Sequence, residues 1–143
     1  MQLVFVYDSK RGATETVVGW MAGVLGRRGH SVEIVGPDDL PTLSADLIVI
    51  GSPIYFEKPM ESMLDFVGKK AVELSARNVA VFILGWAKRV YDRFESHIRN
   101  NHFGPLVNPI EKAVIDSHMF RGWMHHVDPD QKGGGARLDY KLR

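Results

Sequence analysis

The sequence contains no cysteine, and this absence excludes several kinds of chemistry at once. Without thiols the chain can form no disulfide, thiolate metal site or iron–sulfur cluster, and it has no cysteine nucleophile. An excess of charge of one sign is also lacking, because 18 basic and 17 acidic side chains leave a formal net charge of +1. Such a balance provides no bulk attraction for nucleic acid or for an anionic membrane surface. We therefore expect neither as a partner.

Long apolar runs are missing as well. The longest ones are far shorter than the roughly 20 residues that span a bilayer. The chain starts directly with a strand-like segment, without the basic and then apolar regions of a signal peptide. Its 143 residues, of which 45% are hydrophobic, suit one globular domain with a single core. We expect a soluble, cytoplasmic protein with no transmembrane segment.

Strand-like and helix-like segments alternate along the chain. Buried strands read as apolar runs, and amphipathic helices show apolar residues at a spacing of three or four. The alternation predicts an α/β fold with a doubly wound parallel sheet and right-handed crossovers. We expect this domain over residues 1–122 and an irregular C-terminal tail over residues 123–143. The predicted strands are residues 3–7, 31–35, 46–50, 79–84 and 112–116, and the predicted helices are residues 14–28, 60–74 and 90–100.

Three unusual loops follow the first, third and fourth predicted strands. The carboxyl ends of parallel strands share one edge of the sheet, and open α/β sheets bind ligands there. The first loop contains Ser9, Gly12 and Thr14 just before a helix, where hydroxyl and backbone N–H donors suit a phosphate. It matches neither GxxxxGK[ST] nor GxGxxG, and a simple capping turn is the alternative interpretation.

The other two loops are rich in apolar and aromatic residues. Tyr55 and Phe56 lie in the loop predicted over residues 51–59, and Trp86 follows the glycine that ends the fourth strand. Aromatic side chains stack favourably on flat rings. The three loops together predict a ligand with a phosphate at one end and a flat, largely apolar ring at the other. Flavin mononucleotide (FMN) has this shape.

Two segments resemble the flavodoxin-like family of FMN-binding domains. Residues 3–14 (LVFVYDSKRGAT) are similar to the family's first strand and phosphate loop. Residues 46–66 (DLIVIGSPIYFEKPMESMLDF) are similar to its third strand, ring-facing loop and following helix. The resemblance covers about residues 1–122 and implies a flavodoxin-like sheet with strand order 2-1-3-4-5. Within the family, both loops look most like short flavodoxin-domain proteins that include the menaquinone-dependent protoporphyrinogen oxidases.

The resemblance implies non-covalent FMN as the cofactor and assigns its site to three groups of residues. The group that would hold the phosphate is Ser9, Lys10, Arg11, Gly12, Ala13 and Thr14. The groups that would flank the isoalloxazine are Pro53, Ile54, Tyr55 and Phe56 on one side and Gly85, Trp86, Ala87 and Lys88 on the other. No catalytic acid–base pair and no metal ion are expected, since the clustered histidines His118, His125 and His126 lack a carboxylate or cysteine at ligand spacing.

The sequence departs from the family pattern in three ways. Arg11 and Ala13 stand where many members have a hydroxyl or another polar side chain. The acidic surface of many carrier flavodoxins is missing. No final helix is recognisable after the fifth strand, and a parallel sheet needs both faces covered. We expect a homodimer mate, another partner chain or further residues to cover the face that this helix would occupy.

Three functions remain open from the sequence. The first is an FMN electron carrier that exchanges electrons with a redox partner protein. The second is an FMN-dependent oxidoreductase that acts on a quinone-like small molecule or a porphyrinogen. The third is a flavin-free interaction domain that keeps the fold. Both redox functions would use the same loops, so the sequence does not separate them.

Overall fold

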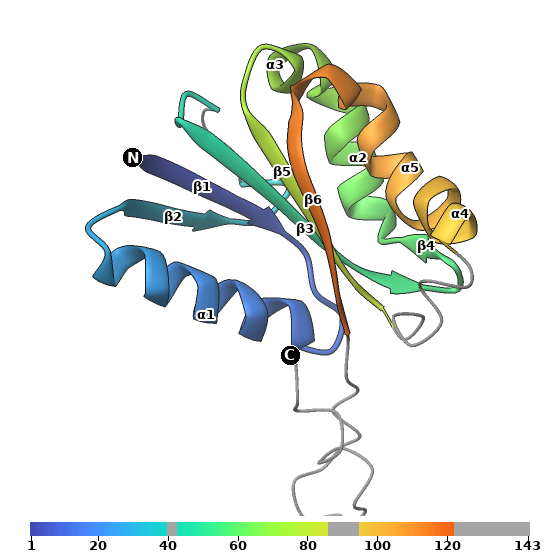
Figure 1. The fold of residues 1–143 in the computed structure, drawn as a ribbon, viewed down its shortest axis with the longest axis horizontal. Helices are drawn as coiled ribbons and strands as arrows, with labels where there is room; N and C mark the ends of the chain where they lie inside the picture. The colour runs from blue at the N-terminus through green and yellow to red at the C-terminus, as the bar shows by residue number, and fades with distance from the viewer. Residues whose placement is uncertain (40–42, 86–94, 122–143) are drawn as a thin grey trace, which may run out of the picture.

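The protein is built on one twisted sheet, seen nearly edge-on in Figure 1. The computed structural model describes residues 1–39, 43–85 and 95–121. The parallel strands lie in the order β2-β1-β3-β5-β6, and the two-residue strand β4 pairs antiparallel with the end of β3. Because β4 is extra, this order confirms the predicted order 2-1-3-4-5. The strands are β1 (Gln2–Tyr7), β2 (Ser31–Val35), β3 (Leu47–Tyr55), β4 (Lys58–Pro59), β5 (Val79–Gly85) and β6 (Val114–Arg121).

Helices cover the two faces of the sheet unequally (Figure 1). One face carries α1 (Ala13–Arg27), which packs its buried Val17 and Val18 against the strands. On the other face the predicted helix over residues 60–74 breaks at Lys70, and Pro59 lies in β4. The segments on this second face are α2 (Glu61–Lys69), α3 (Ala71–Ser75), α4 (Glu95–His97), the π-helix η2 (Ile98–Phe103), α5 (Gly104–Val107) and the 3₁₀-helix η3 (Asn108–Ala113).

Strand β3 is longer than the sequence predicts. Gly51 to Tyr55, predicted as a loop, continue the strand and pair with β5 as far as Pro53 and Leu84. A Cβ atom at Gly51 would lie 2.2 Å from Cζ of Phe82, so the aromatic ring occupies the space of the missing side chain. Pro53 lies beyond the last pair with β1, Tyr7 and Gly51, where the missing N–H interrupts no ladder on that side.

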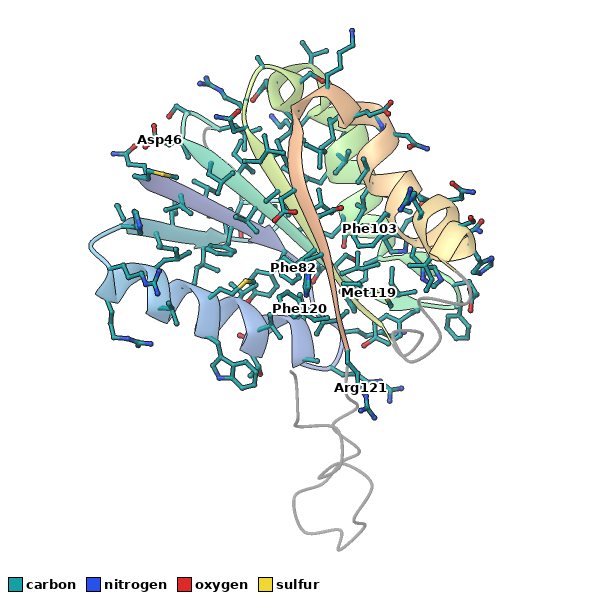
Figure 2. The ribbon with its side chains drawn as sticks, in the orientation of Figure 1. Asp46, Phe82, Phe103, Met119, Phe120 and Arg121 are labelled. Atoms are coloured by element: carbon teal, nitrogen blue, oxygen red, sulfur yellow. The ribbon has the colours of Figure 1, made fainter. Side chains whose placement is uncertain are left out.

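Strand β6 also differs from its prediction, because it covers Val114–Arg121 rather than residues 112–116. On the α1 face, Asp116 and His118 are exposed and Phe120 is partly buried beside Phe82. Figure 2 shows Phe82 and Phe120 close together on the side of α1. Three consecutive polar residues, Asp116, Ser117 and His118, interrupt the strand, which explains why its apolar signal is weak. Within the described ranges, only α1 packs on this face of the sheet.

Two further sequence-based expectations concern the C-terminal tail and membrane-spanning helices. The tail predicted over residues 123–143 lies outside the described residues. Among the residues that the structure describes, no helix has the length and apolar character needed to cross a membrane.

Candidate functional site

The loop after β1 is closed by its own hydrogen bonds. The N–H of Gly12 donates to Oγ of Ser9 at 2.9 Å, and the N–H of Ser9 donates to Oδ1 of Asp8 at 2.8 Å. Gly12 adopts a φ of +89°, a left-handed conformation that glycine takes at little cost. Both the N–H and the hydroxyl of Thr16 donate to the Gly12 carbonyl oxygen, at 3.0 and 2.9 Å. The sequence therefore folds this segment into a preformed loop at the start of α1.

The N-terminus of α1 offers donors to an anion. Gly12 is its N-cap and supplies no side-chain hydrogen bond to the first turn. The hydroxyl of Thr14 is buried and has no hydrogen-bond partner among the described residues. Backbone N–H groups at a helix start lack intrahelical acceptors, and the helix dipole adds partial positive charge there. A phosphate supplies the acceptors that this end of the helix lacks, so the residues present fit that group.

The turn between β3 and β4 is strained. Phe56 and Glu57 adopt φ values of +49° and +68°, although neither is glycine. Such conformations cost roughly 1–2 kcal/mol for each L-residue. Phe56 is also 90% exposed. The buried hydroxyl of Ser52 accepts from the N–H of Met60 at 3.0 Å and donates to the carbonyl of Pro53 at 2.9 Å, which fixes the two ends of the turn.

The loop, the turn and the start of α2 line an open cleft of about 550 Å³. This volume is within the usual range of small-molecule sites. Across it, Nζ of Lys10 lies 5.4 Å from the centre of the Tyr55 ring. Burial raises the pKa of Tyr55, and the positive charge of Arg11 opposes that rise. The lining residues are Asp8, Ser9, Lys10, Tyr55, Phe56, Lys58, Pro59, Met60, Glu61 and Ser62.

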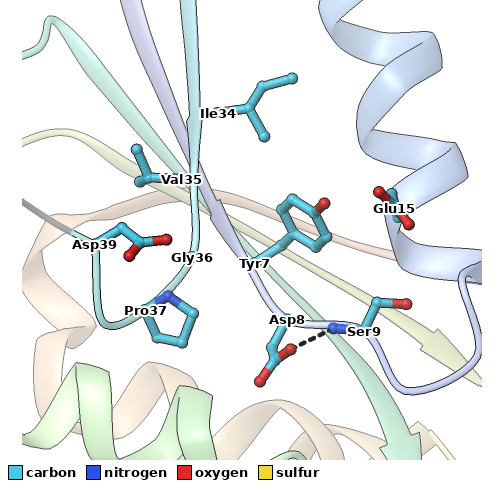
Figure 3. A pocket seen from close by; sticks show the side chains of 9 residues that line it. All are labelled: Tyr7, Asp8, Ser9, Glu15, Ile34, Val35, Gly36, Pro37 and Asp39. Carbon is cyan, nitrogen blue, oxygen red and sulfur yellow. Dashed lines mark hydrogen bonds between the residues drawn. The ribbon is translucent and has the colours of Figure 1, made fainter.

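A second cavity, of about 470 Å³, opens on the other side of Asp8 and Ser9, toward β2 (Figure 3). Carboxylates of Asp8, Glu15 and Asp39 line it. The pKa of Tyr7 is raised first by burial and then by the negative charges of Glu15 and Asp8. Negative walls disfavour a phosphate, and no lysine or arginine of the described ranges lines this cavity. Asp8 and Glu61 also line the larger cavity, but Lys10 and Lys58 balance their charges there. The cavity beside Lys10 is therefore the better site for an anionic ligand.

The structure brings some of the predicted site residues together. Ser9 and Lys10 share the larger cavity with Tyr55 and Phe56. Gly12, Ala13 and Thr14 form the start of α1, directly after the exposed Arg11. The residues Trp86, Ala87 and Lys88 lie outside the described residues.

The remaining predicted residues have packing roles in the structure. Pro53 is buried in β3 beside Leu84 of β5. Ile54 packs against the core, and its Cβ lies 3.6 Å from where a Cβ of Gly85 would be. A Cβ on Gly85 would also lie 2.9 Å from Cε of Met119. Their contact with a flavin ring stays a prediction.

Sequence reasoning missed two contacts near this site. The hydroxyl of Ser62 donates to Oδ2 of Asp8 at 2.5 Å, which joins α2 to the loop after β1. Glu57 contacts His97 and His102, which lie 40 and 45 residues further along the chain. No local spacing indicates pairs so distant in sequence.

A model of the flavodoxin domain family matches residues 4–109, well over half of the chain. The chain belongs to the flavodoxin domain family. No curated protein matches this flavodoxin-domain sequence. The predicted likeness to menaquinone-dependent protoporphyrinogen oxidases stays a prediction.

Solved flavodoxin structures share the fold of this flavodoxin-domain protein. A flavodoxin from the domain Archaea is 17% identical, with a TM-score of 0.58 over 85% of each chain. Two-electron reduced flavodoxin of Megasphaera elsdenii is 21% identical, with a TM-score of 0.59 over 82% of this chain and 84% of its own. FMN-bound flavodoxin of Fusobacterium nucleatum is 10% identical, with a TM-score of 0.57 over 83% and 70%. Identities this low support a shared fold alone.

Proposed function

We propose that the protein binds FMN non-covalently at the carboxyl edge of the sheet and carries electrons to or from a redox partner protein. The observation that carries the proposal is the buried Thr14 hydroxyl without a described partner, at a helix start that no side chain caps. One of the similar solved structures, the Fusobacterium nucleatum flavodoxin, is bound to FMN. Family membership and this phosphate-suited helix start thus point to the same ligand.

The phosphate end of the site would use the loop after β1. Thr14 and Ser9 would offer hydroxyl donors, and the backbone N–H groups of the first turn of α1 would add theirs. Lys10 would contribute positive charge from the cavity wall. A hydrogen bond to a charged group contributes about 1.5–3 kcal/mol.

The ring end of the site would use the β3–β4 turn. Tyr55 and Phe56 line the cavity and offer aromatic surface, and the turn keeps Phe56 in a strained conformation. When bound, FMN supplies the redox chemistry itself, and the protein supplies binding and orientation. Phe56 is 90% exposed and so adds apolar surface beside the cavity, which suits contact with a partner protein.

The decisive experiment compares FMN with riboflavin, which has the same ring but no phosphate. Thr14→Val removes the buried hydroxyl while preserving the shape of the side chain. We expect FMN affinity, measured by quenching of flavin fluorescence, to fall by about tenfold or more. Riboflavin affinity should stay the same. Thr16→Val is the matched control, since Gly12 keeps the hydrogen bond from the Thr16 N–H.

Another pattern of affinities would contradict phosphate binding by this loop. Equal losses of FMN and riboflavin affinity in Thr14→Val would mean that the hydroxyl acts on the fold or on the ring. No quenching with the unchanged protein would favour the flavin-free interaction domain.

Turnover separates a carrier from an enzyme. A carrier loaded with FMN should be reduced by a flavoprotein reductase and should show little reaction with NADH and a quinone alone. Sustained turnover of a quinone or a porphyrinogen by the single protein would establish the oxidoreductase instead. A cytoplasmic location and a homodimer also stay predictions, and the molar mass in solution would test the dimer.

A further inference from the structure

We propose that Glu57, His97 and His102 form a binding site for a divalent transition-metal ion, with Zn²⁺ as the preferred occupant. The potential ligand atoms of these three side chains lie within 4.8 Å of one another. The site is separate from the phosphate loop, and its test needs no flavin. Within the described residues, the cluster joins the β3–β4 turn to the helical segment over residues 95–103, which lies beside β4 in Figure 1.

One oxygen atom is the centre of the cluster. Oε2 of Glu57 lies 2.8 Å from Nε2 of His97 and 3.0 Å from Nε2 of His102. In a tetrahedral site with metal–ligand bonds of about 2.1 Å, neighbouring ligand atoms lie roughly 3.4 Å apart. An ion therefore needs each nitrogen to move about half an ångström away from Oε2. The two nitrogens, which lie within 4.8 Å of each other, must also settle at the same spacing. Side-chain rotations of the exposed Glu57 and His97 can provide that movement.

The π-helix explains how the two histidines meet. Residues five apart on an α-helix differ by about 140° around the axis, so they face different directions. A π-helix has hydrogen bonds from i to i+5 and brings residues five apart onto neighbouring turns. His97 directly precedes η2 and His102 lies within it, and their ring centres are 5.6 Å apart. Single-turn π-helices occur frequently at functional sites.

The backbone conformation of the β3–β4 turn places Glu57 in the cluster. Glu57 has a φ of +68°, which an L-residue adopts only at a cost in free energy. That conformation directs its carboxylate to both histidines.

The chemistry of the three side chains suits a divalent transition-metal ion such as Zn²⁺. Two imidazoles with one carboxylate form one kind of catalytic zinc site, in which a fourth position stays open to water. The side chain of Glu57 is 70% exposed and that of His97 is 52% exposed, so an ion can reach the site from solvent. His102 is 2% exposed and forms the rigid inner wall.

An ordinary ion pair is the competing explanation, because the same three side chains form it without a metal. Nδ1 of buried His102 has no hydrogen-bond partner among the described residues, and it stays unpaired in both cases, so it does not separate the two. The metal site is preferred because one carboxylate and two imidazoles already lie within 4.8 Å of one another, close to ligand spacing. His97 has a different second contact, since Nδ2 of Asn101 lies 3.1 Å from its Nδ1. The same Nδ2 donates to the carbonyl oxygen of His97 at 3.0 Å, so Asn101 holds this histidine in place.

The experiment titrates the untagged full-length protein, freed of metals by a chelator and without FMN, with Zn²⁺ in a calorimeter. We expect saturable binding of one ion. Glu57→Gln and His97→Gln should each weaken Zn²⁺ binding by at least about tenfold. Loss of a residue that only supports a metal ligand weakens binding by roughly 10–100-fold, so loss of a ligand itself should cost at least the lower figure. Both changes are at exposed positions, so folding should survive. Glu111→Gln and His118→Gln alter exposed residues outside the cluster and should leave the affinity unchanged.

A second readout reports the geometry. Co²⁺ in place of Zn²⁺ should give the strong visible absorption of a four-coordinate ion, and this absorption should be lost in Glu57→Gln. Zn²⁺ should also raise the melting temperature of the unchanged protein but not of the two variants. Absence of saturable Zn²⁺ binding would overturn the proposal and leave the ion pair. Binding of undiminished affinity in both Glu57→Gln and His97→Gln would overturn it equally, because the ion would then lie elsewhere.

Discussion

The loop after β1 and the turn after β3 lie at the same edge of the sheet and achieve left-handed backbone in opposite ways. In the loop, the residue with positive φ is Gly12, which takes this conformation at little cost. In the turn, the residues with positive φ are Phe56 and Glu57. A protein retains strained residues where the surrounding structure and the side chains themselves require them. The loop thus depends on its backbone shape, and the turn depends on its side chains.

The two connections are also held differently. Ser9 closes the loop through a hydrogen bond to Gly12, three residues away. The turn is held by distant groups: Ser52 accepts from Met60, and Glu57 meets His97 across 40 residues. The shape of the loop is therefore a local property of the sequence. The shape of the turn exists only once the sheet and η2 have assembled.

The largest expected effect concerns Gly51, the glycine in the part of β3 that leads to the turn. In Gly51→Ala the new Cβ would lie 2.2 Å from Cζ of Phe82, a rigid ring atom. We expect overpacking to lower the free energy of unfolding by about 3 kcal/mol, measured by urea denaturation. Gly68→Ala is the control: its Cβ would meet nothing within 4 Å in α2, and it should raise stability by about 0.5–1 kcal/mol.

A second variant shows whether the ring is the cause. Adding Phe82→Leu to Gly51→Ala removes the clashing atoms and should restore part of the lost stability. An additive loss from the two changes would contradict this explanation.

The next effect tests the loop. Gly12→Ala places a Cβ on a residue with φ of +89°, so we expect a loss of about 1–2 kcal/mol in the free energy of unfolding. Gly12→Asn should lose less, because asparagine tolerates this conformation. Gly19→Ala, at an open position seven residues further along α1, should be neutral or stabilising. Equal stability of Gly12→Ala and Gly19→Ala would show that the loop relaxes to another shape.

The third prediction concerns the turn after β3, where a substitution should preserve or raise the free energy of unfolding rather than lower it. Phe56→Asn replaces an exposed aromatic residue at φ of +49° with one that tolerates left-handed backbone. We expect the free energy of unfolding to stay the same or rise by up to about 1 kcal/mol. FMN and riboflavin affinities should both fall, because the change removes ring contact and leaves the phosphate loop intact. A loss of stability with unchanged flavin affinity would show that Phe56 serves the fold.

The same contrast explains what the sequence could predict. The presence of the strands and the loop before α1 follow from local patterns, namely apolar runs, a glycine and hydroxyl residues before a helix. The strand order is implied by the family resemblance. The continuation of β3 could not be predicted, because Gly51 and Pro53 are typical turn residues. Their roles in β3 depend on Phe82, which lies in β5, and on the point where pairing with β1 ends.

The histidine cluster was beyond prediction for a related reason. His97 and His102 are five residues apart, a spacing that places two side chains on one side only in a π-helix. Glu57 joins them from another element, through a backbone conformation that its residue type disfavours. Sequence reasoning considered His118 instead, which the structure leaves exposed on the other face of the sheet, beside Phe120.

The smallest expected effect is electrostatic. It is the effect of salt on the pKa values of Tyr7 and Tyr55, the tyrosines that end β1 and β3. Burial raises the pKa of both. Glu15 and then Asp8 raise the pKa of Tyr7 further, whereas Arg11 opposes the rise at Tyr55. Salt screens charges at the surface. Added salt should therefore lower the pKa of Tyr7 and raise that of Tyr55.

Tyrosinate absorbance during an alkaline titration measures both values. The difference between the unchanged protein and Tyr7→Phe isolates Tyr7, and Tyr55→Phe isolates Tyr55 in the same way. Each raised pKa contributes stability that is present below the pKa of the unfolded chain and is lost as the pH rises through the folded value. Shifts of the same sign at both tyrosines would mean that the two cavities share one electrostatic environment. Opposite shifts would show that the acidic cavity toward β2 and the cavity beside Lys10 are electrostatically distinct, which is the condition for an anionic ligand to choose the second.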